Sequence, residues 1–102
     1  LVIGDFNDHI ISTLKKIKLL DFAFIDGNHK EKSTIKYFEE CLRYMHNDSI
    51  LIFDDIHWSK GMENAWKHIK KHPKINVTID LFFIGIVFLR KEQYKQHFTI
   101  RF

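Results

Sequence analysis

Carboxylates and histidines gather directly after two short apolar runs in this sequence. Asp26 follows the first run, with His29 three residues later, and Asp54 and Asp55 follow the second run, with His57 just beyond them. Carboxylate oxygens are the ligands that Mg²⁺, Ca²⁺ and Mn²⁺ prefer. Histidine is the side chain that moves protons most readily near neutral pH. These residue types predict a divalent-cation site, an acid–base site, or both.

The two apolar runs predict strands at 20–26 and 49–55, because short apolar runs ended by acids are typical of buried parallel strands. In open α/β sheets, ligands bind outside the carboxyl ends of such strands. Two neighbouring strands of this kind would bring Asp26, Asp54 and Asp55 to one rim of the sheet. We therefore expect these three carboxylates to converge there as metal ligands.

Plainer roles remain open for the same side chains. The three acids could cap the helices that follow them or bind water at the rim. Either histidine, His29 or His57, could serve as a general base, but a rim histidine is more often satisfied by a neighbouring carboxylate, and we favour that role. Trp58 could form a shelf for a flat ring, although packing against the start of the next helix is the commoner use of such a residue.

The order of predicted elements indicates the fold class. The expected elements are strand 1–5, helix 7–18, strand 20–26, helix 31–45, strand 49–55, helix 59–72, strand 75–82 and strand 85–90. Alternating strands and helices predict a parallel sheet with right-handed crossovers. The last two strands leave no room for a helix between them, so they should form an antiparallel hairpin. The sequence thus predicts one α/β domain, residues 1–102, with a Rossmann-like, mostly parallel sheet that is flanked by helices and ends in a β-hairpin.

The composition bears on the number of domains, the cellular compartment and the expected partners. Hydrophobic residues make up 45% of 102 residues, which predicts a packed core in a single domain. The longest apolar stretch, 81–89, is too short to span a bilayer. Cys41, the single cysteine, excludes an intramolecular disulfide, fits a reducing compartment and is expected in the core. We expect a cytoplasmic protein with no membrane contact. The mildly basic charge of +3 comes partly from lysines at one helix end, so nucleic acid is not the expected partner.

Four segments together resemble a known family. They are Gly4-Asp5-Phe6 after the first strand, the segment from Phe24 to His29, the segment from Ile52 to Ile56, and the hairpin that runs from Asp80 to Phe88. They look like the C-terminal part of a class I S-adenosylmethionine-dependent methyltransferase, and are most similar to small bacterial O-methyltransferase-like proteins. The resemblance covers nearly the whole chain.

The resemblance implies methyl transfer from S-adenosylmethionine to an acceptor oxygen of a small molecule. It places Asp5 and Phe6 near the adenine and Asp26 near the methionine end of the cofactor, and it implies a cofactor-binding set of Gly4, Asp5, Phe6, Asp26 and Gly27. In catechol-type relatives, acids at matching positions bind a divalent cation such as Mg²⁺, which orients a substrate hydroxyl. By that comparison, the metal ligands here would be Asp26, Asp54 and Asp55.

The sequence also departs from the family's pattern. The glycine-rich loop and the ribose-binding acid of the family would lie upstream of residue 1, with the first strands of the full fold. We therefore expect the chain by itself to be inactive and to bind S-adenosylmethionine weakly. An inactive remnant or interaction domain stays open as an alternative. A metal-dependent phosphoryl-handling domain also stays open, although the acids come in the wrong order for a receiver domain.

The shortened sheet predicts self-association. Without the upstream strands, one edge of strand 20–26 would be unpaired, and unpaired apolar edges are templates for association. Two arrangements would relieve this exposure. Strand 1–5 can pair directly with strand 20–26, or a second copy of the chain can cover the edge. We expect a two-fold homodimer.

Overall fold

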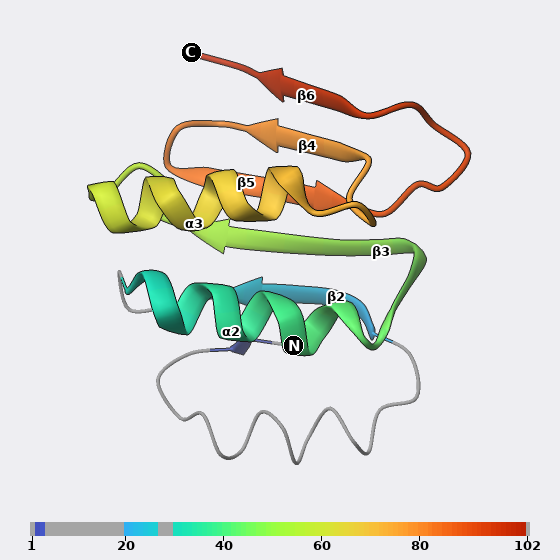
Figure 1. The fold of residues 1–102 in the computed structure, drawn as a ribbon, viewed down its shortest axis with the longest axis horizontal. Helices are drawn as coiled ribbons and strands as arrows, with labels where there is room; N and C mark the ends of the chain where they lie inside the picture. The colour runs from blue at the N-terminus through green and yellow to red at the C-terminus, as the bar shows by residue number, and fades with distance from the viewer. Residues whose placement is uncertain (1, 4–19, 27–29, 102) are drawn as a thin grey trace.

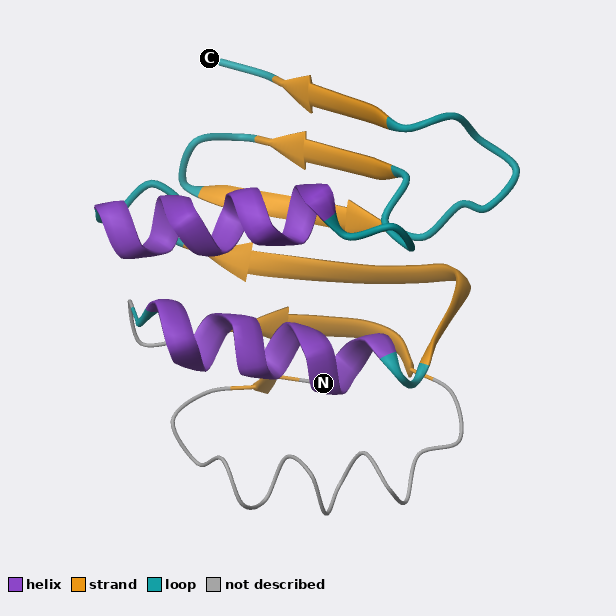
Figure 2. Cartoon of the chain, viewed as in Figure 1, coloured by secondary structure: helices purple, strands orange, loops and turns teal. Residues whose placement is uncertain are grey.

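The computed structural model describes residues 2–3, 20–26 and 30–101. These residues form one six-stranded mixed sheet with the strand order β1-β2-β3-β5-β4-β6, and two helices cover one face of it (Figures 1 and 2). The elements are β1 Val2–Ile3, β2 Leu20–Ile25, α2 Glu31–Leu42, β3 Met45–Asp54, α3 Lys60–Lys71, β4 Val77–Asp80, β5 Ile84–Phe88 and β6 Gln96–Thr99. Neither α2 nor α3 has the length and apolar character that a membrane-crossing helix needs.

The first three strands run parallel to one another. β1 pairs directly with β2, with Ile3 opposite Ile25, and β2 pairs with β3, with Ile25 opposite Phe53. Direct pairing of β1 with β2 is the first of the two arrangements that the sequence predicted for this edge, and it is confirmed. Because β2 and β3 are parallel, their carboxyl ends meet at one edge of the sheet.

The other half of the sheet contains the only antiparallel pairings among the described strands. β5 runs antiparallel to both β3 and β4, with Asp54 opposite Ile84 and Asp80 opposite Gly85. β4 therefore runs in the same direction as β3. The edge strand β6 pairs parallel with β4. The sequence does not predict β6, because all four of its residues are exposed and it carries no alternating buried pattern.

The predicted helix 31–45 is too long. α2 ends at Leu42, where the backbone of Tyr44 turns back to donate a hydrogen bond to the carbonyl of Cys41 at 2.9 Å, and Met45 already begins β3. Met45 still packs against the core from the strand, so the apolar spacing continues beyond the end of the helix. By contrast, the cap of α3 is confirmed, since the Ser59 hydroxyl accepts a hydrogen bond from the backbone of Met62 at 3.2 Å.

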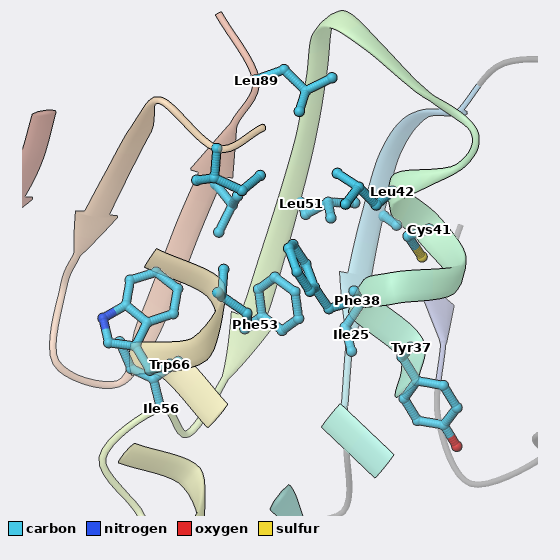
Figure 3. Packing of buried hydrophobic residues seen from close by; sticks show 14 residues of the cluster. Ile25, Tyr37, Phe38, Cys41, Leu42, Leu51, Phe53, Ile56, Trp66 and Leu89 are labelled. Carbon is cyan, nitrogen blue, oxygen red and sulfur yellow. The ribbon is translucent and has the colours of Figure 1, made fainter. Parts of the chain in front are cut away.

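The hydrophobic core lies between the two helices and the sheet (Figure 3). Phe38 of α2, Phe53 of β3 and Trp66 of α3 meet there, and each is at most 2% exposed. Cys41 is fully buried in the same cluster, as expected, and burial raises the pKa of its thiol to about 12. The Trp66 indole lies against the backbone of Gly85, where a Cβ would come within 2.5 Å of the ring. Only glycine fits β5 at this point.

Candidate functional site

The three predicted acids lie at the carboxyl edge of the sheet. Asp26 directly follows Ile25, and Asp54 directly follows Phe53, the residue paired with Ile25. Asp26 is exposed, whereas Asp54 and Asp55 are half-buried. The parallel register thus brings Asp26 alongside Asp54 at the edge where ligands bind in open α/β sheets.

A shared edge is not yet a metal site. Within the described ranges, no group of three or more histidine, cysteine, aspartate or glutamate side chains is arranged to hold a metal ion. A metal role for Asp26, Asp54 and Asp55 therefore stays a prediction, and the geometry adds no ligand cluster in its support.

Several predicted residues lie outside the described part of the chain. They are the proposed base His29 and the cofactor-binding residues Gly4, Asp5, Phe6 and Gly27. Their roles stay predictions. Asp26 is the one predicted cofactor-binding residue that lies within the described part of the chain.

His57 is held between two carboxylates. Its Nδ1 lies 3.0 Å from an oxygen of Glu63, and its Nε2 lies 2.7 Å from an oxygen of Asp80. Both partners are acceptors, so the ring satisfies both contacts when it is protonated on both nitrogens. Burial alone lowers the pKa of His57, but hydrogen bonds to the two carboxylates, together with their charges, outweigh burial and leave this pKa raised.

This geometry agrees with the plainer of the two roles considered for His57. A general base needs an unshared nitrogen lone pair facing the substrate, and both nitrogens already face carboxylates. The catalytic role of His57 stays a prediction. The observed contacts of His57 tie the loop after β3 to the first turn of α3 and to the end of β4.

Asp80 is the centre of this network, although it was not among the site residues predicted from the sequence. It is only 7% exposed, yet it accepts hydrogen bonds from the backbone of Phe82 at 2.8 Å and from the Arg101 guanidinium at 3.2 Å, besides its contact with His57. Burial raises the pKa of Asp80, but these three donors outweigh it and lower the pKa. A usable signal existed, because β4 also ends on an acid at this edge, as β3 does.

A small pocket opens beside this network. Its lining residues are Asp55, His57 and Trp58 from the loop after β3, and Phe82 and Phe83 from the turn between β4 and β5; we call it the aromatic pocket. Its volume is about 230 Å³. The two walls are joined directly, since the backbone of Asp55 donates a hydrogen bond to the carbonyl of Phe83 at 2.7 Å.

The aromatic rings of this pocket differ in how they are held. Phe82 stacks on the His57 ring at 5.4 Å between centroids, and the Arg101 guanidinium lies 5.1 Å from the centre of the Phe82 ring. Trp58 is 64% exposed, so most of its side chain does not pack against α3, and its use as a shelf for a flat ring stays a prediction. The pocket therefore has one wall braced by charged groups and another that faces solvent.

A family model described as a methyltransferase domain matches residues 1–56, more than half of the 102 residues. The match runs through β3 and into the loop that carries Asp55, and so includes both strand ends with the predicted acids. No curated protein matches the chain.

Proposed function

The chain belongs to the methyltransferase domain family, and on that premise we propose that it serves S-adenosylmethionine-dependent methyl transfer to an acceptor oxygen of a small molecule. The observation that supports this most is the alignment of Asp26 with Asp54 at the carboxyl edge of β2 and β3. This is the edge at which open α/β sheets bind their ligands.

The cofactor supplies an electrophilic methyl group on a sulfonium. The Asp26 carboxylate is exposed at the end of β2, and an ionised carboxylate accepts hydrogen bonds only, which suits the ammonium group at the methionine end of the cofactor. Asp26 is thus the described residue that would hold the cofactor. The remaining proposed contacts fall outside the described residues.

The contribution of the chain to catalysis would be mainly positioning. A methyl group moves when acceptor and donor are held in line, and orientation alone supplies a large part of such a barrier reduction. The His57–Asp80 network fixes the walls of the aromatic pocket at the same edge as Asp26. Assistance by a divalent cation stays a separate prediction, which the addition of Mg²⁺ to the titration below would test.

A cofactor titration followed by ¹H–¹⁵N NMR tests the proposal. Millimolar S-adenosylmethionine should shift the backbone signals of Asp26 and Asp54, with weak, saturable binding. Asp26→Asn should abolish these shifts. Asp21→Asn is the matched control, because Asp21 is an exposed aspartate near the other end of β2 and its replacement should leave the response intact. Absence of shifts at the carboxyl edge, or shifts that survive Asp26→Asn, would overturn the proposal.

A further inference from the structure

A second pocket lies at the amino end of β3, at the opposite edge of the sheet from Asp26 and Asp54. We call it the cationic pocket. Its volume is about 400 Å³, and the described residues that line it include Leu42, Arg43, Met45, Lys74, Leu89 and Lys91. These residues come from the end of α2, the start of β3, the segment between α3 and β4, and the segment that follows β5. The pocket thus forms where four separate parts of the chain meet.

Part of the pocket lining is apolar. Leu42 and Leu89 are buried members of the hydrophobic core, and Met45 packs against the same core. Figure 3 shows Leu42 and Leu89 at the end of the core that lies away from Trp66 and Ile56. The volume of about 400 Å³ lies within the usual range of about 300–1,000 Å³ for small-molecule sites, whose linings are mostly apolar. The pocket can therefore hold the apolar part of a small molecule.

Three cationic residues complete the lining. Arg43, Lys74 and Lys91 are all exposed, and each comes from a different one of the four parts of the chain. Among the described residues, no ion pair involves Lys74 or Lys91. Arg43 lies 3.9 Å from Glu40, but its side chain is 73% exposed, and an exposed pair of this kind contributes little. All three positive charges can therefore bind a ligand at small cost to the fold.

The negative groups at this end of the sheet already have partners. Five described carboxylates each contact a histidine, an arginine or an amide, and none of the five lines the pocket: Asp21, Glu39, Glu40, Asp48 and Glu92. The C-terminal ends of α2 and α3, where a helix dipole is negative, also lie at this end. The Lys95 ammonium offsets the end of α3, because it donates hydrogen bonds to the carbonyls of Lys70 and His72 at 3.2 and 2.9 Å. The charge that remains at the pocket is positive.

Hydrogen bonds fix one wall of the pocket. Asn47 accepts a hydrogen bond from the backbone of Lys91 at 2.7 Å and donates one to Glu92 at 2.6 Å. Asn76, which also lines the pocket, donates to the carbonyl of Arg90 at 3.0 Å. These contacts hold Arg90 at a φ of 41°, a conformation that residues other than glycine rarely adopt. A wall that is fixed before binding reduces the entropy lost when a ligand binds.

We propose that the cationic pocket binds a small anion with an apolar body, with medium-chain carboxylates as the simplest class. The anionic head would pair with Arg43, Lys74 and Lys91, and the body would cover Leu42 and Leu89. A guanidinium binds a carboxylate or phosphate through two parallel hydrogen bonds, and an ammonium binds it as a point charge. This inference does not rest on the proposed function, because the pocket lies at the opposite edge of the sheet and needs no cofactor.

The test uses octanoate as the probe, without S-adenosylmethionine, and follows backbone amides by ¹H–¹⁵N NMR at low ionic strength. Octanoate should shift the signals of Met45, Leu89 and Lys91 in a saturable manner, while that of Asp54 at the other end of β3 stays in place. Acetate keeps the head without the body, and 1-octanol keeps the body without the charge. Each should bind about tenfold more weakly than octanoate, or weaker still. Octylammonium, which reverses the charge, should give no comparable shifts.

Lys74→Gln combined with Lys91→Gln should weaken octanoate binding about tenfold, since each exposed charge contributes a few-fold. The matched control is Lys67→Gln combined with Lys71→Gln, which removes the same net charge from exposed positions of α3 outside the pocket lining and should leave the affinity unchanged. Equal losses in the two double variants, or equal binding of octanoate and 1-octanol, would overturn the inference. Absence of saturable octanoate shifts, with an intact cofactor response at Asp26, would sink this inference alone. The reverse result would support the pocket and remove the proposed function.

Discussion

Replacement of Asp80 with asparagine is the sharpest test of the network that braces the aromatic pocket. The change keeps the shape of the side chain and removes its charge. Three donors converge on this carboxylate: His57 Nε2 at 2.7 Å, the Phe82 backbone at 2.8 Å and Arg101 Nη1 at 3.2 Å. An asparagine offers one acceptor oxygen and one amide NH₂ group, so at least one of the donors would face another donor while His57 is protonated.

The expected loss follows from these contacts. A hydrogen bond that involves a charged group contributes about 1.5–3 kcal/mol, and an unpaired partner at a buried position adds to the loss. Asp80 is 7% exposed, but the Arg101 side chain is 47% exposed and recovers water on replacement. We therefore expect Asp80→Asn to lower the free energy of unfolding by about 2–3 kcal/mol under conditions in which His57 is protonated.

The loss should depend on pH in a defined direction. The pKa of His57 is raised above 6.5, so its contribution is complete below pH 6.5 and is lost as pH rises through the raised value. The pKa of Asp80 is lowered below 3.8, so its contribution is present above pH 3.8 and is lost as pH falls through the lowered value. The effect of Asp80→Asn should thus be largest between pH 3.8 and 6.5.

Urea unfolding of the wild type and the variant, at about pH 5.5 and about pH 8.5, measures both the size and the pH dependence. Asp48→Asn is the matched control. Asp48 is also an aspartate beside an arginine, Arg90, at 3.5 Å, but its side chain is 76% exposed, so the change should cost less than about 0.5 kcal/mol. A loss for Asp80→Asn below about 1 kcal/mol, or one equal at both pH values, would refute the reasoning.

Three further predictions concern stability and assembly. Gly85→Ala should lower the free energy of unfolding in urea by about 1–3 kcal/mol, because the new Cβ would lie 2.5 Å from the Trp66 ring. Gly61→Ala is the control. A Cβ at that position would lie 3.5 Å from the nearest atom of Glu31, so the free energy of unfolding should not fall. Ser59→Ala should cost about 1 kcal/mol in thermal or urea unfolding through loss of the α3 cap, and an unchanged midpoint would contradict the assigned cap. Light scattering should detect a homodimer, since Phe22 on the sheet remains 45% exposed despite the pairing of β1 with β2, and a clean monomer at high micromolar concentration would contradict this.

Much of the fold follows from the sequence because its strands and helices differ in apolar period. The segments around Phe53 and Trp66 have the strand and helix patterns that the structure shows. The end of α2 and the strand β6 were predicted wrongly or not at all, because the local spacing of apolar residues does not reflect the structure there. Met45 continues the apolar spacing of α2 after the chain has turned into β3, and β6 buries none of its four residues. Its position depends on the edge of β4, which no local feature of β6 encodes.

The candidate site was also predicted only in part from the sequence. Acids that follow apolar runs indicate the edge of the sheet, because strand direction alone carries the ends of parallel strands to one side. The contact between His57 and Asp80 joins residues 23 positions apart and requires β4 to lie beyond β5 and parallel to β3. Neither the strand order nor that partnership is encoded near either residue, so the network could not be predicted locally.

The parallel strands β2, β3, β4 and β6 all end at or near a charged residue on the same edge of the sheet. β3 and β4 each end on an acid, and β2 and β6 reach Asp26 and Arg101 within two residues of their ends. Because β3, β4 and β6 point the same way, the buried carboxylate of Asp80 can be neutralised from both sides, by the His57 ring and by Arg101. That neutralisation lets an ionised acid stay buried at the end of β4, where it contacts His57 and Phe82 of the aromatic pocket. The edge strand β6, absent from any pattern in the sequence, therefore contributes to the site by bringing Arg101 to the carboxylate that holds Phe82 in place.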